Sequence, residues 1–260
     1  MNDLVEVAIE NGVATVTVNN PPVNSLGKPT LSAMGNVFEK LAVDPSVRSI
    51  VLTAKGDKAF LAGADISEFP DLMNDLGAMS AHMTWCRGVF DRICTMPQPV
   101  IAAVQANCVG GGLEVALLCD IIIADETAKF GLPETRLGLI PGGGGTQRLA
   151  RLIGPHVAKQ MLMLGSVISA SEAHRLGIIN DLAAVGEVGL MAGKLAHKLA
   201  GLPAIAVQAA KKAVDDGLAL PLEKALDREQ ALFLETFSSS DFKEGLQAFL
   251  DKRKPQFTHQ

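Results

Sequence analysis

Polar and apolar residues alternate over the first part of the chain. The alternation runs from Val5 to Ile9, and a second alternating run occupies residues 13–18. Between the two runs, Asn11-Gly12 is a dipeptide that favours a tight turn joining two strands. We therefore expect a β-hairpin at the start of the chain.

Strand and helix patterns then follow each other with short connections. Apolar residues at helical spacing predict a helix over 30–43, with Thr30 as its N-cap, and a longer helix over 75–95. Residues 55–69 read as a loop with a turn at Gly63. Continuous apolar runs predict short buried strands at 50–52, 100–104 and 121–123. This alternation indicates an α/β core with mostly buried strands.

Helical periodicity dominates after about residue 145. It predicts successive helices at 146–153, 155–164, 170–176, 187–200, 204–217, 221–236 and 240–252. We divide the chain at about residue 200, into an α/β core at 1–200 and a helical region at 201–260.

Composition and charge limit the class of protein. The 260 residues are 48% hydrophobic, which is enough for a sizeable core, and 23 basic against 28 acidic residues leave a net charge of −5. This acidic balance disfavours nucleic acid or an anionic membrane as a partner. The most apolar stretch is broken by Glu114 and Asp120, so we expect no membrane-spanning helix. The first residues, MNDLVEVAIENG, do not resemble a secretory leader, and we expect a cytoplasmic protein.

The cysteines and histidines form no recognisable framework. The four cysteines are scattered without a CxxC pair, and reduced thiols are the better expectation in a chain with so large a core. The five histidines form neither an HxH nor an HExxH pattern, so the sequence predicts no zinc or other metal site.

Three glycine clusters stand out, at 62–65 (AGAD), 110–115 (GGGLEV) and 142–148 (GGGGTQR). The second lacks the last glycine of a dinucleotide-binding fingerprint, and the third lacks the Lys-Ser/Thr pair of a phosphate-binding loop. Each cluster could simply form a turn. Glycines that open a helix also leave backbone N–H groups free, and two such groups from separate segments can form an oxyanion hole. The turn at Gly63-Ala64 and the segment at Gly111-Gly112 are the candidates.

Two carboxylates lie in unusually apolar surroundings. Glu114 is embedded in the run LEVALL, and Glu134 follows a proline in a loop rich in apolar residues and glycine. A buried glutamate is costly unless it is paired or used. Glu114 could form a buried salt bridge, with Arg136 or Arg148, and Glu134 could be a solvated loop charge or a helix cap. Alternatively, the two carboxylates beside an oxyanion hole would suit acid/base chemistry on an enolisable carbonyl.

The order and spacing of these blocks resemble a known family. The run from 100 to 154, VIAAVQANCVGGGLEVALLCDIIIADETAKFGLPETRLGLIPGGGGTQRLARLIG, resembles the signature of the enoyl-CoA hydratase/isomerase family, the crotonases. The segments AFLAGADISEF at 59–69, PPVNSL at 21–26 and FKEGLQAFLDKRKPQF at 242–257 resemble further parts of that family. The resemblance covers essentially the whole chain.

The resemblance implies a fold and an assembly. Members of the family have a spiral of ββα turns followed by a helical trimerisation region. They form homotrimers that often pair into hexamers. The α/β spiral would occupy 1–200, with the coenzyme A (CoA) thioester site, and the oligomerisation region would occupy 201–260.

The resemblance also implies roles for particular residues. The backbone amides of Ala64 and Gly111 would form the oxyanion hole for the thioester oxygen. Glu114 would activate water for attack at the β-carbon, and Glu134 would deliver a proton to the α-carbon. Further contacts to the substrate would come from Ser25, Ala62, Asp65, Ile66 and Gly142.

One position departs from the pattern. Many hydratases of the family carry lysine where this chain has Ser67. Contacts to the CoA phosphates would then fall to other basic residues, of which Lys252 is our candidate beside Lys55, Lys58, Arg253 and Lys254. Each of these residues could equally serve solubility alone.

The presence of both glutamates favours one reaction of the family. Isomerases commonly keep only the carboxylate at the position of Glu134, so the resemblance implies a lyase that hydrates a 2-trans-enoyl-CoA to the 3-hydroxyacyl-CoA. The alternatives are isomerisation of a 3-enoyl-CoA and hydration of a branched acyl-CoA such as methylglutaconyl-CoA. RNA binding and a catalytically inactive assembly subunit are less consistent with the acidic charge and the intact site. No cofactor is implied, because CoA is part of the substrate.

Overall fold

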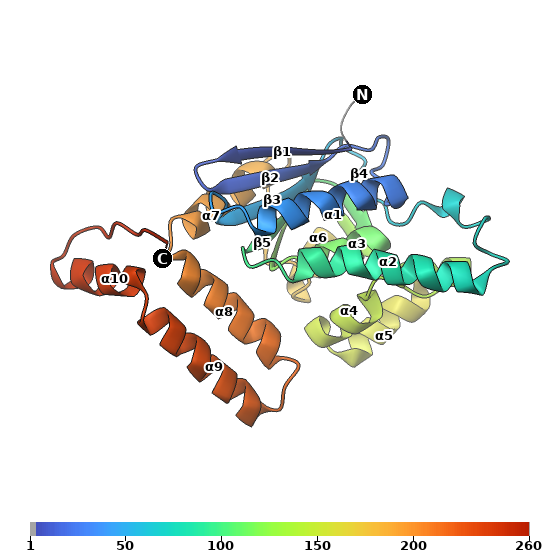
Figure 1. Cartoon of the computed structure of the whole chain (residues 1–260). Coiled ribbons are helices and arrows are strands. Elements are labelled where there is room, and N and C mark those ends of the chain that lie inside the picture. Colours follow the sequence, from blue (N-terminus) through green and yellow to red (C-terminus); the bar gives the residue numbers. More distant parts are fainter. Residues whose placement is uncertain (1–3, 260) are drawn as a thin grey trace.

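The computed structural model describes residues 4–259, which form two sheets surrounded by helices (Figure 1). The larger sheet has six strands in the order β1-β2-β3-β5-β7-β10. Their bounds are Val5–Glu10, Val13–Val18, Ser49–Ala54, Val100–Val104, Ile121–Asp125 and Asp181–Ala183. The smaller sheet has four strands in the order β4-β6-β8-β9. Their bounds are Ala59–Leu61, Asn107–Val109, Lys129–Gly131 and Val167–Ser169.

The predicted hairpin is confirmed. Strands β1 and β2 pair antiparallel, with Glu10 opposite Val13, and Asn11 and Gly12 in the turn both have positive φ angles. The remaining strands of the large sheet are parallel, and every residue of β5 is buried. A strand buried on both faces explains why this segment is apolar throughout instead of alternating.

From β3 to β8, successive strands alternate between the two sheets, and this confirms the predicted ββα organisation. Strand β3 is followed by β4 and then α2, β5 by β6 and then α3, and β7 by β8 and then the helices that follow it. The smaller sheet thereby brings the ends of β4, β6 and β8 side by side. The chain segments that follow these three strands carry the candidate site.

Every predicted helix is present, and its ends lie within two residues of the predicted bounds. The bounds of the helices are Lys28–Ala42 (α1), Leu76–Cys94 (α2), Gly111–Ala116 (α3), Gly145–Ile153 (α4), Pro155–Leu164 (α5), Ala170–Arg175 (α6), Val188–Ala200 (α7), Ala204–Gly217 (α8), Leu222–Phe237 (α9) and Ser240–Leu250 (α10). The prediction of Thr30 as an N-cap is wrong. Helix α1 begins two residues earlier because Pro29 fits its first turn, and the buried Thr30 hydroxyl instead accepts a hydrogen bond from Asn20.

The segment 55–69 is not purely a loop. It contains strand β4 and a short 3₁₀ helix, η1, at Ile66–Glu68. Both elements have three residues, so neither shows a period that the sequence could reveal. The predicted turn at Gly63 is confirmed by a φ of +97°.

Two apolar clusters lie on opposite faces of the large sheet. The larger cluster fills the space between the sheets and beneath α1, α2 and α3. The smaller one lies under α7, whose Ala192, Ala196 and Ala200 face the sheet. These small side chains allow close approach, and the Ser49 hydroxyl donates a hydrogen bond of 2.9 Å to the carbonyl of Ala196. The strands that carry the site are thus fixed from both sides.

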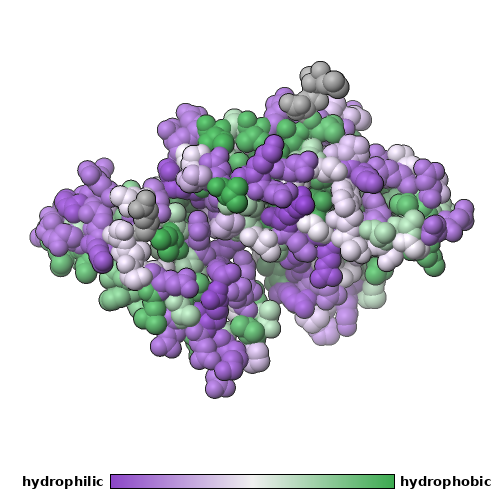
Figure 2. Space-filling view, viewed as in Figure 1, coloured by the Kyte–Doolittle hydropathy of each residue, from purple (hydrophilic) through white to green (hydrophobic). Residues whose placement is uncertain are grey.

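Helices α8, α9 and α10 extend from this core toward one end of the molecule (Figure 1). They bury few side chains, and large apolar residues such as Leu218, Phe233 and Phe249 are exposed by 81%, 60% and 80%. Hydrophobic residues are visible on the surface of this part of the molecule in Figure 2. Lys211 of α8 ties the region to the core through an ion pair of 2.8 Å with Asp120. The boundary at residue 200 and the oligomerisation role of 201–260 stay predictions.

Candidate active site

Two free backbone amides, those of Ala64 and Gly111, lie close together after the ends of β4 and β6. A methyl group built on Gly63 would lie 3.2 Å from the nitrogen of Gly111, and one built on Gly111 would lie 3.3 Å from the nitrogen of Ala64. Within residues 4–259, neither of these two amides donates a hydrogen bond. Gly111 is the first residue of α3, where backbone N–H groups have no partner inside the helix. The pair is suited to hold an oxygen that gains negative charge.

The close approach of the two segments depends on Gly112. A Cβ atom at this position would overlap the carbonyl oxygen of Leu61, the last residue of β4. Parallel pairing of β4 with β6 sets this distance, and the hydrogen bond of 2.8 Å from the Leu26 amide to the Gly63 carbonyl holds the other side of the turn. The glycine cluster at 110–112 is therefore required by packing between the two donor segments.

Glu114 lies one turn into α3 and is only 4% exposed. Its Oε1 atom accepts hydrogen bonds of 2.7 Å from the amide of Gly143 and 2.8 Å from that of Gly145. Within residues 4–259 it forms no ion pair with Arg136 or Arg148, so the alternative of a buried salt bridge is wrong. The second carboxylate oxygen remains available for chemistry.

Glu134 approaches the same place from η2, the 3₁₀ helix at Glu134–Leu137 that follows β8. Its Oε1 atom lies 3.3 Å from the position that a Cβ on Gly110 would take. Its Oε2 atom is buried and has no hydrogen-bond partner within the described residues. A solvated loop charge would not leave a buried, unpartnered oxygen, so this alternative is also wrong. The structure brings Glu114, Glu134 and the two free amides together around Gly110–Gly111.

The pKa of each of the two carboxyl groups is raised above its ordinary value. Burial raises the pKa of Glu114, although the amides of Gly145 and Gly143 and the positive charge of Arg148 act in the opposite direction. Burial also raises the pKa of Glu134, and the negative charge of Glu114 adds to this rise. Raised pKa values allow a carboxyl group to give and take protons nearer to neutral pH.

The raised pKa of Glu114 predicts a pH-dependent effect on stability. When a pKa is higher in the folded than in the unfolded state, ionisation of the group favours unfolding. The contribution of the Glu114 carboxyl to the free energy of unfolding is therefore present at low pH and is lost as the pH rises through its folded-state pKa. We expect Glu114→Gln to have the Tm of the wild type near pH 4.5 and a higher Tm at pH 7. In a chain of this length, each kcal/mol added to the free energy of unfolding raises the Tm by about 2–4 °C.

Thermal unfolding of both proteins between pH 4.5 and 8 measures this effect. The exposed Glu126→Gln serves as the control, for which the difference should not grow with pH. A Tm difference for Glu114→Gln that shrinks with rising pH would contradict the prediction.

Four of the remaining predicted substrate contacts lie around the turn at Gly63-Ala64, which carries one of the two free amides. Ala62 immediately precedes it and is half-buried, whereas Ile66 is 62% exposed in η1. Asp65 caps η1 by accepting a hydrogen bond from the Ser67 amide, and its other oxygen lies 3.5 Å from the Ser25 hydroxyl. Ser25, Ala62, Asp65 and Ile66 therefore surround one turn, although their contact with a substrate stays a prediction.

Gly142 and Lys252 have different surroundings. A Cβ on Gly142 would lie 2.7 Å from the terminal methyl carbon of Met83, which places α2 beside the loop at 142–145 that holds Glu114. Lys252 follows α10, at the end of the molecule away from α2 (Figure 1). The structure does not bring Lys252 to the other candidates within this chain, and its role in CoA binding stays a prediction.

The sequence analysis missed the loop that positions Glu114. The amides of Gly143 and Gly145 hold its carboxylate, and the ring of Phe90 packs against the same loop, where a Cβ on Gly143 would overlap it. A signal was present, because glycines in front of a helix leave donors free. The sequence lacks the residues of a phosphate-binding loop here, and it predicts a turn or, through the resemblance, a substrate contact at Gly142, but not a role in holding Glu114.

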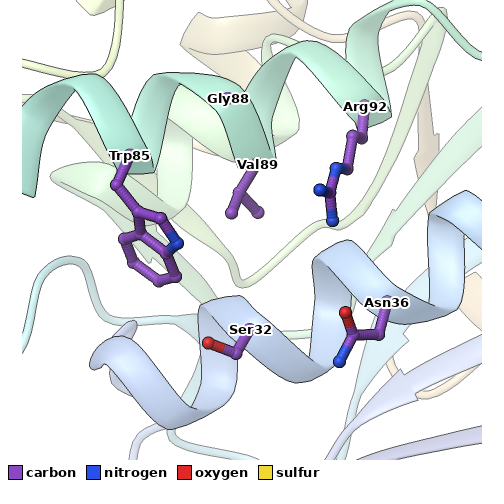
Figure 3. Close-up of a pocket in the computed structure, with 6 residues that line it drawn as sticks. All are labelled: Ser32, Asn36, Trp85, Gly88, Val89 and Arg92. Atoms are coloured by element: carbon purple, nitrogen blue, oxygen red, sulfur yellow. The ribbon is translucent and has the colours of Figure 1, made fainter.

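A cavity of about 360 Å³ lies elsewhere, between α1 and α2 (Figure 3). It is lined by Ser32, Asn36, Trp85, Gly88, Val89 and Arg92. None of these residues belongs to the cluster of amides and carboxylates. The candidate active site is therefore identified by its backbone N–H donors and its two carboxyl groups, and not by the size of this cavity.

These features define an acid/base enzyme that stabilises an oxyanion. Two free amides from separate segments can stabilise an oxyanion, and the buried Glu114 and half-buried Glu134 beside them can move protons. Among residues 4–259 no three His, Cys, Asp or Glu side chains are arranged to hold a metal ion. No helix in the same range is long and apolar enough to cross a membrane.

The comparisons with known proteins agree with this class. The profile of the family described as "Enoyl-CoA hydratase/isomerase" matches residues 8–260. A crotonyl-CoA hydratase of Syntrophomonas wolfei is 41% identical over 251 residues, with 95% of each chain covered. A short-chain-enoyl-CoA hydratase of Clostridium acetobutylicum is 40% identical over 248 residues, with 94% of each covered.

A solved structure extends the likeness to the fold. The crystal structure of an enoyl-CoA hydratase from Bacillus anthracis superposes with a TM-score of 0.94 at 35% identity, covering 99% of this chain and 100% of that one. The chain belongs to the enoyl-CoA hydratase/isomerase family, as its sequence motifs predicted.

Proposed function

We propose that this protein is a lyase that hydrates 2-trans-enoyl-CoA thioesters to 3-hydroxyacyl-CoA. The observation that carries the proposal is the convergence of the Ala64 and Gly111 amides with the carboxyl groups of Glu114 and Glu134. The names of relatives at about 40% identity support the same reaction.

The geometry supports a separate role for the two amides and for each of the two carboxyl groups. The thioester oxygen accepts hydrogen bonds from the amides of Ala64 and Gly111, which stabilise the negative charge that develops when the β-carbon is attacked. Glu114 takes a proton from water as the water oxygen bonds to the β-carbon, and Glu134 gives a proton to the α-carbon. The overall result is addition of one water molecule across the double bond. Exchange of protons with solvent restores both carboxyl groups.

Two carboxyl groups favour hydration over isomerisation. Moving a double bond requires a proton to leave one carbon and return to another, which a single carboxyl group can perform. Addition of water needs a second group to activate the water. The hydrogen bonds that fix Glu114 to Gly143 and Gly145 give this second carboxylate a defined position.

Loss of the conjugated enoyl-thioester absorbance on crotonyl-CoA tests the proposal. We expect rapid loss with the wild type, with 3-hydroxybutyryl-CoA as the product. The Glu126→Gln protein should behave as the wild type, because this residue is exposed in the connection between β7 and β8 and belongs to none of the segments that form the candidate site. An unchanged absorbance would overturn short-chain hydration.

The alternative reactions give different products. If the wild type does not act on crotonyl-CoA, a 3-enoyl-CoA tests isomerisation through the appearance of conjugated absorbance. Methylglutaconyl-CoA tests hydration of a branched chain. Formation of a conjugated product from the 3-enoyl thioester alone would make isomerisation the function.

We also propose that the chain works as a homotrimer or a dimer of trimers in the cytoplasm, with no cofactor beyond the CoA of its substrate. The exposed apolar residues of α8–α10 support self-association, because exposed patches of this kind commonly mark protein interfaces. The four cysteines are all free, in keeping with a reducing compartment. Light scattering at several protein concentrations measures the assembly state.

A further inference from the structure

Arg148 is a half-buried cation without an ion pair. It lies at the end of the first turn of α4, and none of the ion pairs among residues 4–259 includes it. Its Nε atom is buried and has no hydrogen-bond partner within the same range. A guanidinium group stays charged, and taking a charge out of water without a partner is costly. Departures of this kind are expected mainly where a side chain has a functional role.

Three consecutive glycines connect Arg148 with Glu114. A Cβ on Gly144 would lie 3.4 Å from the Nε atom of Arg148, whose own amide donates a hydrogen bond of 2.9 Å to the Gly144 carbonyl. Cβ atoms on Gly143 and Gly145 would lie 2.8 Å and 3.0 Å from oxygens of the Glu114 carboxylate. The guanidinium and the carboxylate therefore contact adjacent residues of one short loop. At such a range opposite charges attract each other even without a direct hydrogen bond.

The other groups around the Glu114 carboxylate do not supply a positive charge. Glu134 of η2 is negatively charged when ionised, and Phe90 and Leu132, which contact the same loop, are apolar. Burial raises the pKa of Glu114, and its two amide donors and the charge of Arg148 oppose this rise. Arg148 thus contributes the positive charge on this side of the site.

We propose that Arg148 is a positioning residue that keeps Glu114 in the charged form needed to take a proton from water. The inference rests on the proposed hydration of enoyl-CoA. Glu114 can activate water only as a carboxylate, whereas its burial favours the neutral acid. A fixed positive charge close to the loop offsets that tendency. Because Arg148 forms no direct ion pair with Glu114, the second carboxylate oxygen stays free for the water.

Helix α8 offers a rival role for Arg148. Burial and the negative charge of Asp120 raise the pKa of Asp215 in α8, whereas the charges of Lys211 and Arg148 act in the opposite direction. Arg148 is therefore also within electrostatic range of α8, which the ion pair between Lys211 and Asp120 already ties to the core. If Arg148 served only to hold α8, loss of the Asp215 charge would reproduce the loss of Arg148.

The test is the pH dependence of kcat/KM for crotonyl-CoA in the wild type and in Arg148→Gln. Removal of a nearby positive charge makes ionisation of the carboxyl less favourable, so the pKa of Glu114 should rise. We expect the acidic limb of the profile, which reports this ionisation in the free enzyme, to move by about one pH unit toward higher pH. The variant should lose about tenfold in kcat/KM on the acidic side and little above the limb.

Three further variants separate charge from structure. Arg148→Lys keeps the positive charge and should return the acidic limb toward that of the wild type. Arg151→Gln removes the same charge from an exposed position in the last turn of α4, and Asp215→Asn removes the exposed carboxylate of α8. Both should leave the limb where it is. A uniform loss at every pH in Arg148→Gln, or an equal shift in Asp215→Asn, would overturn the proposal.

A second measurement does not depend on catalysis. Arg148→Gln is introduced into the wild type and into Glu114→Gln, and the Tm of each protein is measured at pH 8. The fall in Tm should be larger in the wild-type background, because only there does the substitution remove an attraction between opposite charges. Equal changes in the two backgrounds would exclude the interaction.

The outcomes distinguish this inference from the proposed function. A wild type that does not hydrate crotonyl-CoA removes the function, and the thermal measurement still decides whether Arg148 acts on Glu114. A wild type that hydrates crotonyl-CoA with a profile that Arg148→Gln leaves in place removes only the role of Arg148. Should Arg148→Gln fail to fold, Arg148→Lys decides, because a shifted acidic limb in a variant that keeps the charge would contradict the proposal.

Discussion

Replacement of either Glu114 or Glu134 by glutamine is expected to lower kcat for crotonyl-CoA by about 10²–10⁴-fold. Glutamine preserves the shape of the side chain and its carbonyl oxygen, so the hydrogen bonds from Gly143 and Gly145 to position 114 can persist. It cannot take a proton from water or give one to carbon. Steady-state rates at saturating substrate measure the effect.

Two comparisons show whether the loss is chemical. KM should change by much less than kcat in both variants, because neither carboxylate is proposed to hold the CoA part of the substrate. The Tm of Glu114→Gln at pH 7 should exceed that of the wild type, because burial raises the pKa of this carboxyl in the folded state. Full activity in either variant would exclude that glutamate from the mechanism.

Gly112→Ala is expected to abolish most of the activity and to destabilise the fold. The added Cβ would overlap the carbonyl oxygen of Leu61, a backbone atom that cannot rotate away. Overpacking of this kind typically costs about 1–3 kcal/mol. To relieve it, the start of α3 must move from the end of β4, which separates the Gly111 amide from that of Ala64. Loss of one oxyanion donor costs about 10²–10³-fold in kcat.

A helical glycine with open space around it provides the matched control. Gly193 lies within α7, and a Cβ there would meet no atom within 4 Å. Gly193→Ala should therefore raise the free energy of unfolding by about 0.4–1 kcal/mol and leave kcat unchanged. Urea unfolding and crotonyl-CoA kinetics on both variants measure the two effects. Wild-type activity in Gly112→Ala would show that the donors do not depend on this contact.

Much of the fold could be predicted because its longer elements repeat regularly. The hairpin turn at Asn11-Gly12 and the buried strand at 100–104 each carry a clear local signal. The three-residue strands of the smaller sheet, such as β4 and β9, have no such signal. They form because neighbouring segments supply hydrogen-bond partners, which a single local pattern does not contain.

The candidate site shows the same limit. Glu114 could be found from the sequence because a carboxylate in an apolar run is unusual. The partners of its carboxylate, the amides of Gly143 and Gly145, are 29 and 31 residues away and contribute only backbone atoms. In the sequence, Met83 is one of several apolar residues within the helix predicted over 75–95. Its contact with Gly142 depends on how α2 is placed against the loop, which periodicity does not determine.

The position of the oxyanion donors also determines how the enzyme can be divided. A break between α2 and β5 would leave the Ala64 amide in one fragment and the Gly111 amide, with both glutamates, in the other. Neither fragment alone would contain a complete site. Pairing of β3 with β5, in which Ile50 lies opposite Val100, and pairing of β4 with β6 are the sheet contacts that would rejoin them. Hydration by a mixture of the two fragments would thus report their reassembly, so that the enzyme could serve as a split reporter of association between proteins fused to its halves.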